Sequence, residues 1–218
     1  GLERIGERTT AARLIDRAAQ PGPAVAAAFR ADDTVPTLAA AAAARPADPE
    51  AAVPLIRAQL DAGDRAGALA RAQAIAARNQ GAPGAHQLLG DTLMLLGRAG
   101  DAVPAYRRAA DLRFDEPAML RLVEALDATG QRRPAAQVLA LFLSQNPVNV
   151  TALRLAGQWQ LAAGDFAAAI DTFELLRARI GDGDALLDAA LATAYAEIGD
   201  ADTAAEFGEA AYALAPAN

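Results

Sequence analysis

The sequence lacks two residue types completely: among its 218 residues there is no cysteine and no lysine. The absence of cysteine excludes disulfide bonds, thiol catalysis and zinc–thiolate sites. The absence of lysine excludes side-chain amine chemistry such as Schiff-base formation. All 20 basic residues are therefore arginines.

Histidine and serine each occur only once, as His86 and Ser144. A single histidine excludes histidine clusters and dyads, and we interpret His86 as a packing residue and Ser144 as an ordinary helix-end residue. Asp182 and Asp184 flank Gly183 in a short GDGD phrase. The ligand spacing and distal glutamate of a calcium loop are missing there, so a turn is the better interpretation. We predict no metal site, no cofactor and no enzymatic activity.

Positive charge and long apolar runs are also scarce. The net charge of −7 disfavours nucleic acid, whose binding requires the neutralisation of phosphates. No apolar run reaches 18 residues, so no membrane insertion is expected, and the first 30 residues show no signal-peptide pattern. Because the sequence starts with glycine and not methionine, we expect a processed or trimmed chain. Its end lacks the polar capping helix that normally closes a helical solenoid, so we expect a piece of a longer bacterial protein. The sequence does not decide between the cytoplasm and the periplasm.

Alanine is what the sequence has in abundance. Hydrophobic residues make up 53% of the chain but aromatic residues only 5%. Alanine has the highest intrinsic helix propensity, so this composition predicts an all-α fold. Because alanine buries little area, such a fold needs many close helix contacts.

A repeat of 33 to 35 residues runs through most of the chain. It is marked by glycines at one position: Gly63, Gly97, Gly130, Gly164 and Gly199. An alanine follows each glycine after five residues: Ala68, Ala102, Ala135, Ala169 and Ala204. Each glycine can end a helix with a positive φ, and the small alanine allows two helices to cross. Each unit is therefore predicted to be a helical hairpin.

With this period, the chain resembles the tetratricopeptide repeat (TPR) family. The family's Leu-Gly pair of the first helix is matched by Leu89-Gly90 and Ala156-Gly157. Its aromatic residue in the second helix is matched by Tyr106 and Phe173. The resemblance implies a right-handed superhelical solenoid of antiparallel helix hairpins.

We predict five repeats within residues 48–218, with these approximate bounds: 49–82, 83–115, 116–149, 150–184 and 185–218. Asp48 and Pro49 are expected to start the first helix, whereas Pro54 should kink it or delay its start. Residues 1–47 are predicted to form an N-terminal helix over 2–20 and a degenerate hairpin over 24–31 and 37–45.

The TPR resemblance implies that the first helices line a concave groove that binds a peptide or helix of a partner protein. The predicted partner-binding residues are Arg57, Gln87, Asp91, Met94, Arg121, Glu124, Arg154, Gln158 and Leu161. The carboxylate clamp of chaperone-binding relatives is absent, since no lysine is available. Arg121 and Arg154 either bind a carboxylate of the ligand or pair with Glu124 and Asp127. Trp159 is either a binding anchor or, as we favour, a packing residue.

The main functional prediction is a protein–protein interaction scaffold. One alternative is a periplasmic TPR segment of an exopolysaccharide export or assembly system. The other is a regulatory TPR segment of a larger enzyme. The sequence does not identify the partner or the oligomeric state.

Overall fold

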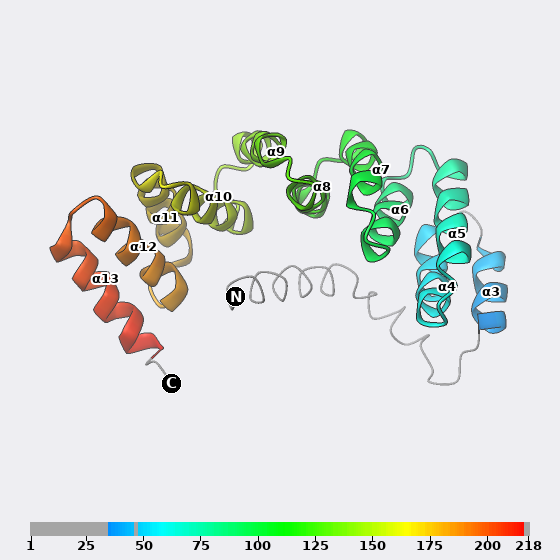
Figure 1. Cartoon of the computed structure of the whole chain (residues 1–218), viewed down its shortest axis with the longest axis horizontal. Helices are drawn as coiled ribbons and strands as arrows, with labels where there is room; N and C mark the ends of the chain where they lie inside the picture. Colours follow the sequence, from blue (N-terminus) through cyan, green and yellow to red (C-terminus); the bar gives the residue numbers. More distant parts are fainter. Residues whose placement is uncertain (1–34, 46–47, 216–218) are drawn as a thin grey trace. The chain divides into compact units, whose positions relative to one another are not determined.

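The computed structural model describes residues 35–45 and 48–215, and every regular element in these ranges is an α-helix (Figure 1). The predicted all-α class is therefore confirmed for the described residues. The expected helices over 2–20 and 24–31 lie outside them. The expected second part of the N-terminal hairpin is α3, Val35–Ala44.

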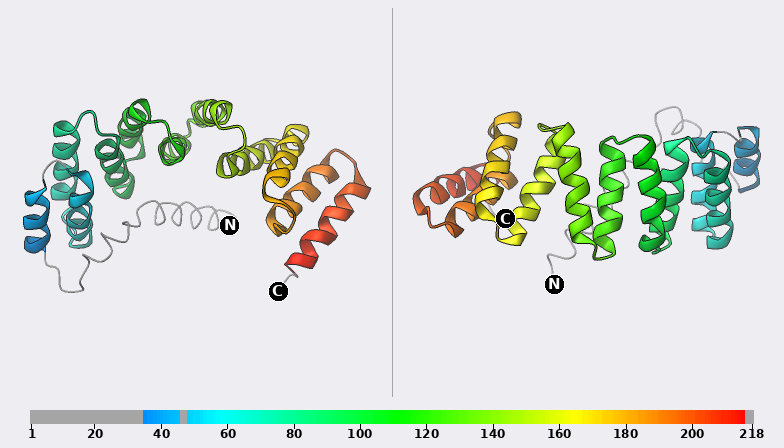
Figure 2. Two further views of the ribbon diagram at one scale, coloured as in Figure 1. Left: turned by 180° about the vertical axis from the view of Figure 1, so that it is seen from behind. Right: turned by 90° about the horizontal axis from the view of Figure 1, so that it is seen from above.

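The chain divides into two compact units, residues 1–135 and 136–218. The first unit holds α3 and five further helices: α4 Pro49–Asp61, α5 Arg65–Arg78, α6 Pro83–Leu95, α7 Ala99–Leu112 and α8 Glu116–Ala128. Helix α9, Arg132–Gln145, contains the boundary. The second unit holds four further helices: α10 Val150–Ala163, α11 Phe166–Ile180, α12 Ala185–Glu197 and α13 Ala201–Leu214. Within each unit, successive helices pack as hairpins; α6 with α7 and α12 with α13 are examples (Figure 2).

The predicted glycine turns connect the helices of each hairpin. All five turn glycines have a φ between 74° and 86°. At Gly164, which ends α10 with φ 78°, the following Asp165 donates its N–H to the carbonyl of Gln160. The Asp165 side chain then accepts from the N–H of Ala168 and caps α11, as predicted. At this turn, a left-handed glycine followed by a capping aspartate thus ends one helix and starts the next.

The alanines five residues after these glycines are buried where the helices meet. Ala68, Ala102, Ala135 and Ala169 have no exposed surface, and Ala204 is half-buried. This confirms the prediction that small residues at this place allow close packing. Larger side chains there would separate the helices.

The glycines of the first helices leave space for a side chain of the neighbouring helix. At Gly90, an added Cβ would collide with the ring of Tyr106, and at Gly157 with the ring of Phe173. Each ring comes from the second helix of the same hairpin. The glycine therefore makes room for the aromatic ring that the TPR resemblance places there.

The buried residues form several thin clusters. One joins α3 to α4 around Leu38 and Leu55, and another joins α4 to α6 around Ile56 and Leu88. In the second unit, Phe173 is the largest side chain that is fully buried. Helix α4 starts at Pro49 with Asp48 as its cap, so the predicted delay by Pro54 is wrong: the helix simply includes this proline. No helix in the described ranges is long and apolar enough to cross a membrane.

Candidate functional site

The first helices of the first unit present matching positions side by side. Helix α6 contacts both α4 and α8. Arg57, Asp91 and Glu124 each lie six residues before the turn glycine that ends their hairpin's first helix. They therefore occupy equivalent places on α4, α6 and α8. We call the surface formed by these three helices around these residues the first-helix face.

A hydrogen-bonded network joins α6, α7 and α8 on this face. The Oδ1 atom of Asp91 accepts from the hydroxyl of Tyr106 at 2.7 Å and from Nε of Arg121 at 2.8 Å. The side chains of Arg121 and Asp91 are only 13% and 27% exposed. Partial burial makes this ion pair less screened by solvent than a surface pair. Asp91 is thus fixed by donors from two neighbouring helices.

Glu124 lies beside this network. Burial, together with the negative charge of Asp91, raises the pKa of Glu124 to about 7, and Arg121 opposes this only partly. Burial and the Asp91 carboxylate also raise the pKa of Tyr106, which keeps its hydroxyl a donor. Among the described residues, Glu124 makes no ion pair and no hydrogen bond through its carboxyl group. It is a half-buried carboxyl group that changes its charge near neutral pH.

Arg121 and Arg154 do not have the partners that the sequence predicted. Arg121 pairs with Asp91 of the preceding hairpin, whereas Arg154 pairs with Asp184 of the following one, 2.5 Å from Nη2 to Oδ2. The predicted pairing with Glu124 and Asp127 is therefore wrong. Each arginine instead pairs with a carboxylate 30 residues away in the chain: Asp91 on α6, which contacts α8, serves Arg121, and Asp184 at the start of α12, which contacts α10, serves Arg154.

The carboxylate of Asp184 accepts several hydrogen bonds in addition to the one from Arg154. Burial would raise its pKa, but hydrogen bonds from Arg154 and from the N–H groups of Leu187 and Leu186 lower it. The same carboxylate therefore caps α12 and binds an arginine. This explains the GDGD phrase as a turn, in which Asp182 pairs with Arg177. Across the described ranges, no group of three or more histidine, aspartate or glutamate residues could hold a metal ion.

The other predicted binding residues lie in two separate sets. Gln87, Asp91 and Met94 follow one another at helical spacing on α6, and Gln87 and Met94 are half-buried. Arg154, Gln158 and Leu161 have the same spacing on α10 in the second unit, where Gln158 is exposed and Leu161 packs against the core. Of the α6 set, the structure brings Asp91 together with Arg121 and Glu124. The role of all these residues in binding stays a prediction.

The sequence analysis did not predict a role for the hydroxyl of Tyr106. It predicted packing for His86 and left two roles open for Trp159. At the aromatic position, one hairpin has Phe173 and another has Tyr106, and this difference signals a polar partner for the buried hydroxyl. His86 is half-buried, and its Nε2 atom hydrogen-bonds the carbonyl oxygen of Gln80. Trp159 is half-buried as well, so neither of its two predicted roles is decided.

The chain is similar to known tetratricopeptide repeat proteins in one segment of its sequence and in its fold. The model of the tetratricopeptide repeat family matches residues 83–116. The crystal structure of YrrB, described as a TPR protein with an unusual peptide-binding site, is 16% identical, covers 84% of this chain and 94% of its own, and has a TM-score of 0.62. A crystal structure of MamA is 20% identical, covers 73% and 87%, and has a TM-score of 0.61. MamA from Desulfovibrio magneticus RS-1 is 20% identical, covers 73% and 90%, and has a TM-score of 0.59.

No curated protein matches the sequence. The matched segment contains all of α6 and α7, which is one complete hairpin. The predicted resemblance to the tetratricopeptide repeat family is confirmed: the chain contains a tetratricopeptide repeat, and its helices have the fold of proteins of that family.

Proposed function

We propose that this protein is an interaction scaffold that binds a segment of a partner protein on the first-helix face of its first unit. The tetratricopeptide repeat and the peptide-binding site named for YrrB support this class of function. The single observation that carries the proposal is the half-buried carboxyl group of Glu124 beside the Asp91–Arg121 pair. The two alternatives, exopolysaccharide export and enzyme regulation, have no specific observation in their favour.

The charged groups of the first-helix face favour a ligand with a positive charge. Arg121 already binds Asp91, so its charge is compensated within the chain. Glu124 adds a second carboxylate next to that pair, and its ionisation is disfavoured without a further cation. An arginine or lysine of the partner would supply that cation and form a charge-assisted hydrogen bond. Apolar contact near Met94 would contribute the remaining affinity.

This mechanism makes binding depend on pH in a defined direction. A partner cation pairs only with ionised Glu124, whose pKa in the free protein is about 7. Below that pH, binding must first remove a proton, so affinity falls as pH falls. Between pH 6 and pH 8, linkage predicts a change in Kd of about tenfold.

The test starts from partner capture with the full 218-residue chain, followed by affinity measurement on the identified segment at pH 6 and pH 8. Glu124→Gln should weaken binding at pH 8 by about tenfold and abolish the pH dependence. Glu206→Gln on α13 makes the same change on an exposed helix surface of the second unit and serves as the control. Unchanged affinity in Glu124→Gln, with the pH dependence intact, would place the binding site elsewhere.

A further inference from the structure

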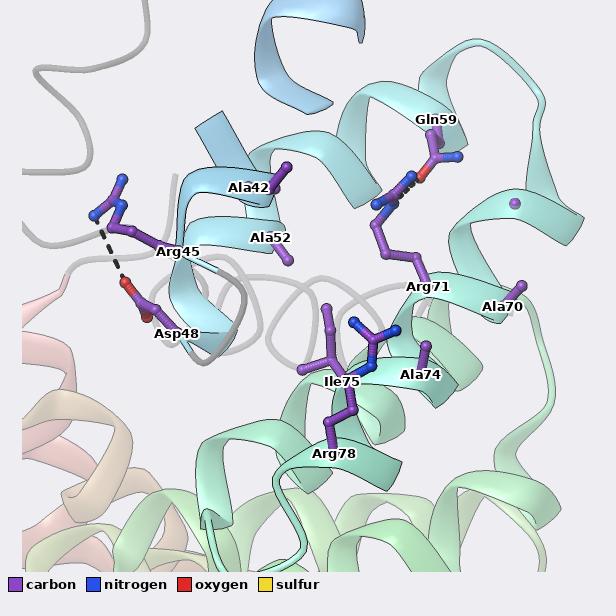
Figure 3. Close-up of a pocket in the computed structure, with 12 residues that line it drawn as sticks. Ala42, Arg45, Asp48, Ala52, Gln59, Ala70, Arg71, Ala74, Ile75 and Arg78 are labelled. Carbon is purple, nitrogen blue, oxygen red and sulfur yellow. Dashed lines mark hydrogen bonds and ion pairs between the residues drawn. The ribbon is translucent and has the colours of Figure 1, made fainter. Parts of the chain in front are cut away.

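A cleft of about 520 Å³ opens between α3, α4 and α5 (Figure 3). Half of the residues that line the cleft lie on one face of α5, the second helix of its hairpin. These residues have helical spacing: Gly67, Ala70, Arg71, Ala74, Ile75 and Arg78. Ala42 of α3 and Ala52 of α4 line it as well. The cleft shares α4 with the first-helix face, but its arginines Arg71 and Arg78 lie on α5, which is not part of that face.

Hydrogen bonds between side chains fix the polar part of the cleft. Gln59 is 8% exposed and donates its Nε2–H to Asp64 at 2.9 Å. Its Oε1 atom accepts from Nε of Arg71 at 3.0 Å. Figure 3 shows this contact between α4 and α5. Arg71 is therefore oriented by a neutral amide, which fixes the guanidinium group without compensating its charge.

The charge of the cleft differs in sign from the charge of the chain. The chain carries −7, but the cleft contains three arginines and a single carboxylate, Asp48. Arg45 lies 3.6 Å from Asp48 and is paired with it. Neither Arg71 nor Arg78 has a carboxylate within ion-pairing distance among the described residues. Within the described part of the chain, two positive charges without a carboxylate partner thus lie along one side of a cleft whose apolar lining consists mainly of small side chains.

The spacing of these two positive charges suggests that the ligand is a helix. Arg71 and Arg78 are seven residues apart on α5, which corresponds to about 10 Å along the helix axis. The exposed Ala74 lies between them. A helix that presents two carboxylates seven residues apart matches this distance, and small side chains on α5 allow it to approach closely. A nucleic acid would need many neutralised phosphates, and two arginines do not supply them.

We propose that the cleft between α3, α4 and α5 is a second docking site, which binds an acidic amphipathic helix of a partner protein. The carboxylates of that helix pair with Arg71 and Arg78, and its small apolar side chains contact Ala70, Ala74 and Ile75. Charge contacts of this kind weaken as salt increases.

The experiment measures fluorescence anisotropy of a labelled synthetic helical peptide with the full chain. The peptide is rich in alanine and leucine and carries glutamates seven residues apart on one face; a second peptide has glutamine at those positions. Ala74→Glu places a negative charge inside the cleft, and we expect at least about tenfold weaker binding of the acidic peptide. Arg78→Gln should weaken it by about threefold to fivefold.

Ala77→Glu is the matched control, since Ala77 is also exposed on α5 but does not line the cleft. Circular dichroism verifies that each variant is folded. The proposal is supported when the acidic peptide binds, the glutamine peptide binds more weakly, and only the cleft variants lose affinity. It is overturned when the acidic peptide does not bind to the unmodified chain, when both peptides bind equally, or when Ala74→Glu and Ala77→Glu behave alike.

Discussion

The packing of an aromatic ring over a helix glycine can be tested at Gly157. An ideal Cβ atom at this position would lie 2.6 Å from Cδ1 and 2.9 Å from Cζ of Phe173. The ring is 1% exposed and belongs to the main core cluster of the second unit. Because the ring is rigid and enclosed, it cannot move aside without opening that cluster.

Two effects of opposite sign determine the result of Gly157→Ala. Replacing glycine by alanine inside a helix stabilises by about 1 kcal/mol. Overpacking a filled core destabilises by about 1–3 kcal/mol. Gly208→Ala on α13 isolates the first effect, because an added Cβ there meets no atom within 4 Å. Relative to Gly208→Ala, we therefore expect Gly157→Ala to be less stable by about 1–3 kcal/mol.

Urea unfolding followed by circular dichroism measures this difference, and Gly157→Leu should lie further in the destabilising direction. The double variant Gly157→Ala with Phe173→Leu adds a check, since a smaller side chain relieves the collision and gives a favourable coupling energy. If Gly157→Ala and Gly208→Ala stabilise the protein equally, the ring does not fill the space over the glycine and the packing argument fails.

Three further predictions concern polar groups. The pKa of Glu124 is raised from 4.5 to about 7, so the folded state retains its proton longer and stability falls as pH rises through this window. Glu124→Gln should remove that fall and stabilise the protein at pH 8 by about 1–2 kcal/mol, discounted for partial exposure; equal pH profiles would contradict this. Tyr106→Phe leaves Asp91 with one donor fewer, and thermal unfolding should show a loss of about 1 kcal/mol. Calorimetric titration with calcium should show no submicromolar site at Asp182 and Asp184; a stoichiometric tight site would disprove the turn interpretation.

The hairpin architecture could be predicted because its causes are local. A glycine that must adopt a positive φ, such as Gly164, marks a helix end wherever it stands. Asp165 then caps the next helix from the adjacent position. The buried alanine five residues later repeats with the same period. Such signals involve residues close together in sequence, so they do not depend on how the hairpins stack.

The ion pairs could not be predicted, because they depend on which neighbouring hairpin supplies a carboxylate. Arg121 and Arg154 occupy nearly the same place in their repeats, yet one pairs with the preceding hairpin and the other with the following one. Asp184 is available to Arg154 because it already caps α12 at that end of the helix. The division into two units within α9 also has no counterpart in the periodic pattern.

These pairings bear on the two roles that the sequence left open for Arg121 and Arg154. The two arginines were expected either to bind a carboxylate of the ligand or to pair with Glu124 and Asp127. Both guanidinium groups are instead neutralised by carboxylates of this chain, and the group left beside Arg121 is the carboxyl group of Glu124. A cationic side chain of the partner is what we propose to pair with that carboxyl group. Among the described residues, Arg71 and Arg78 on α5 have no carboxylate within ion-pairing distance, and we propose the acidic ligand for their cleft and not for the first helices. Whether a charged side chain is already paired within the chain is therefore better evidence for its role in binding than its position in the repeat.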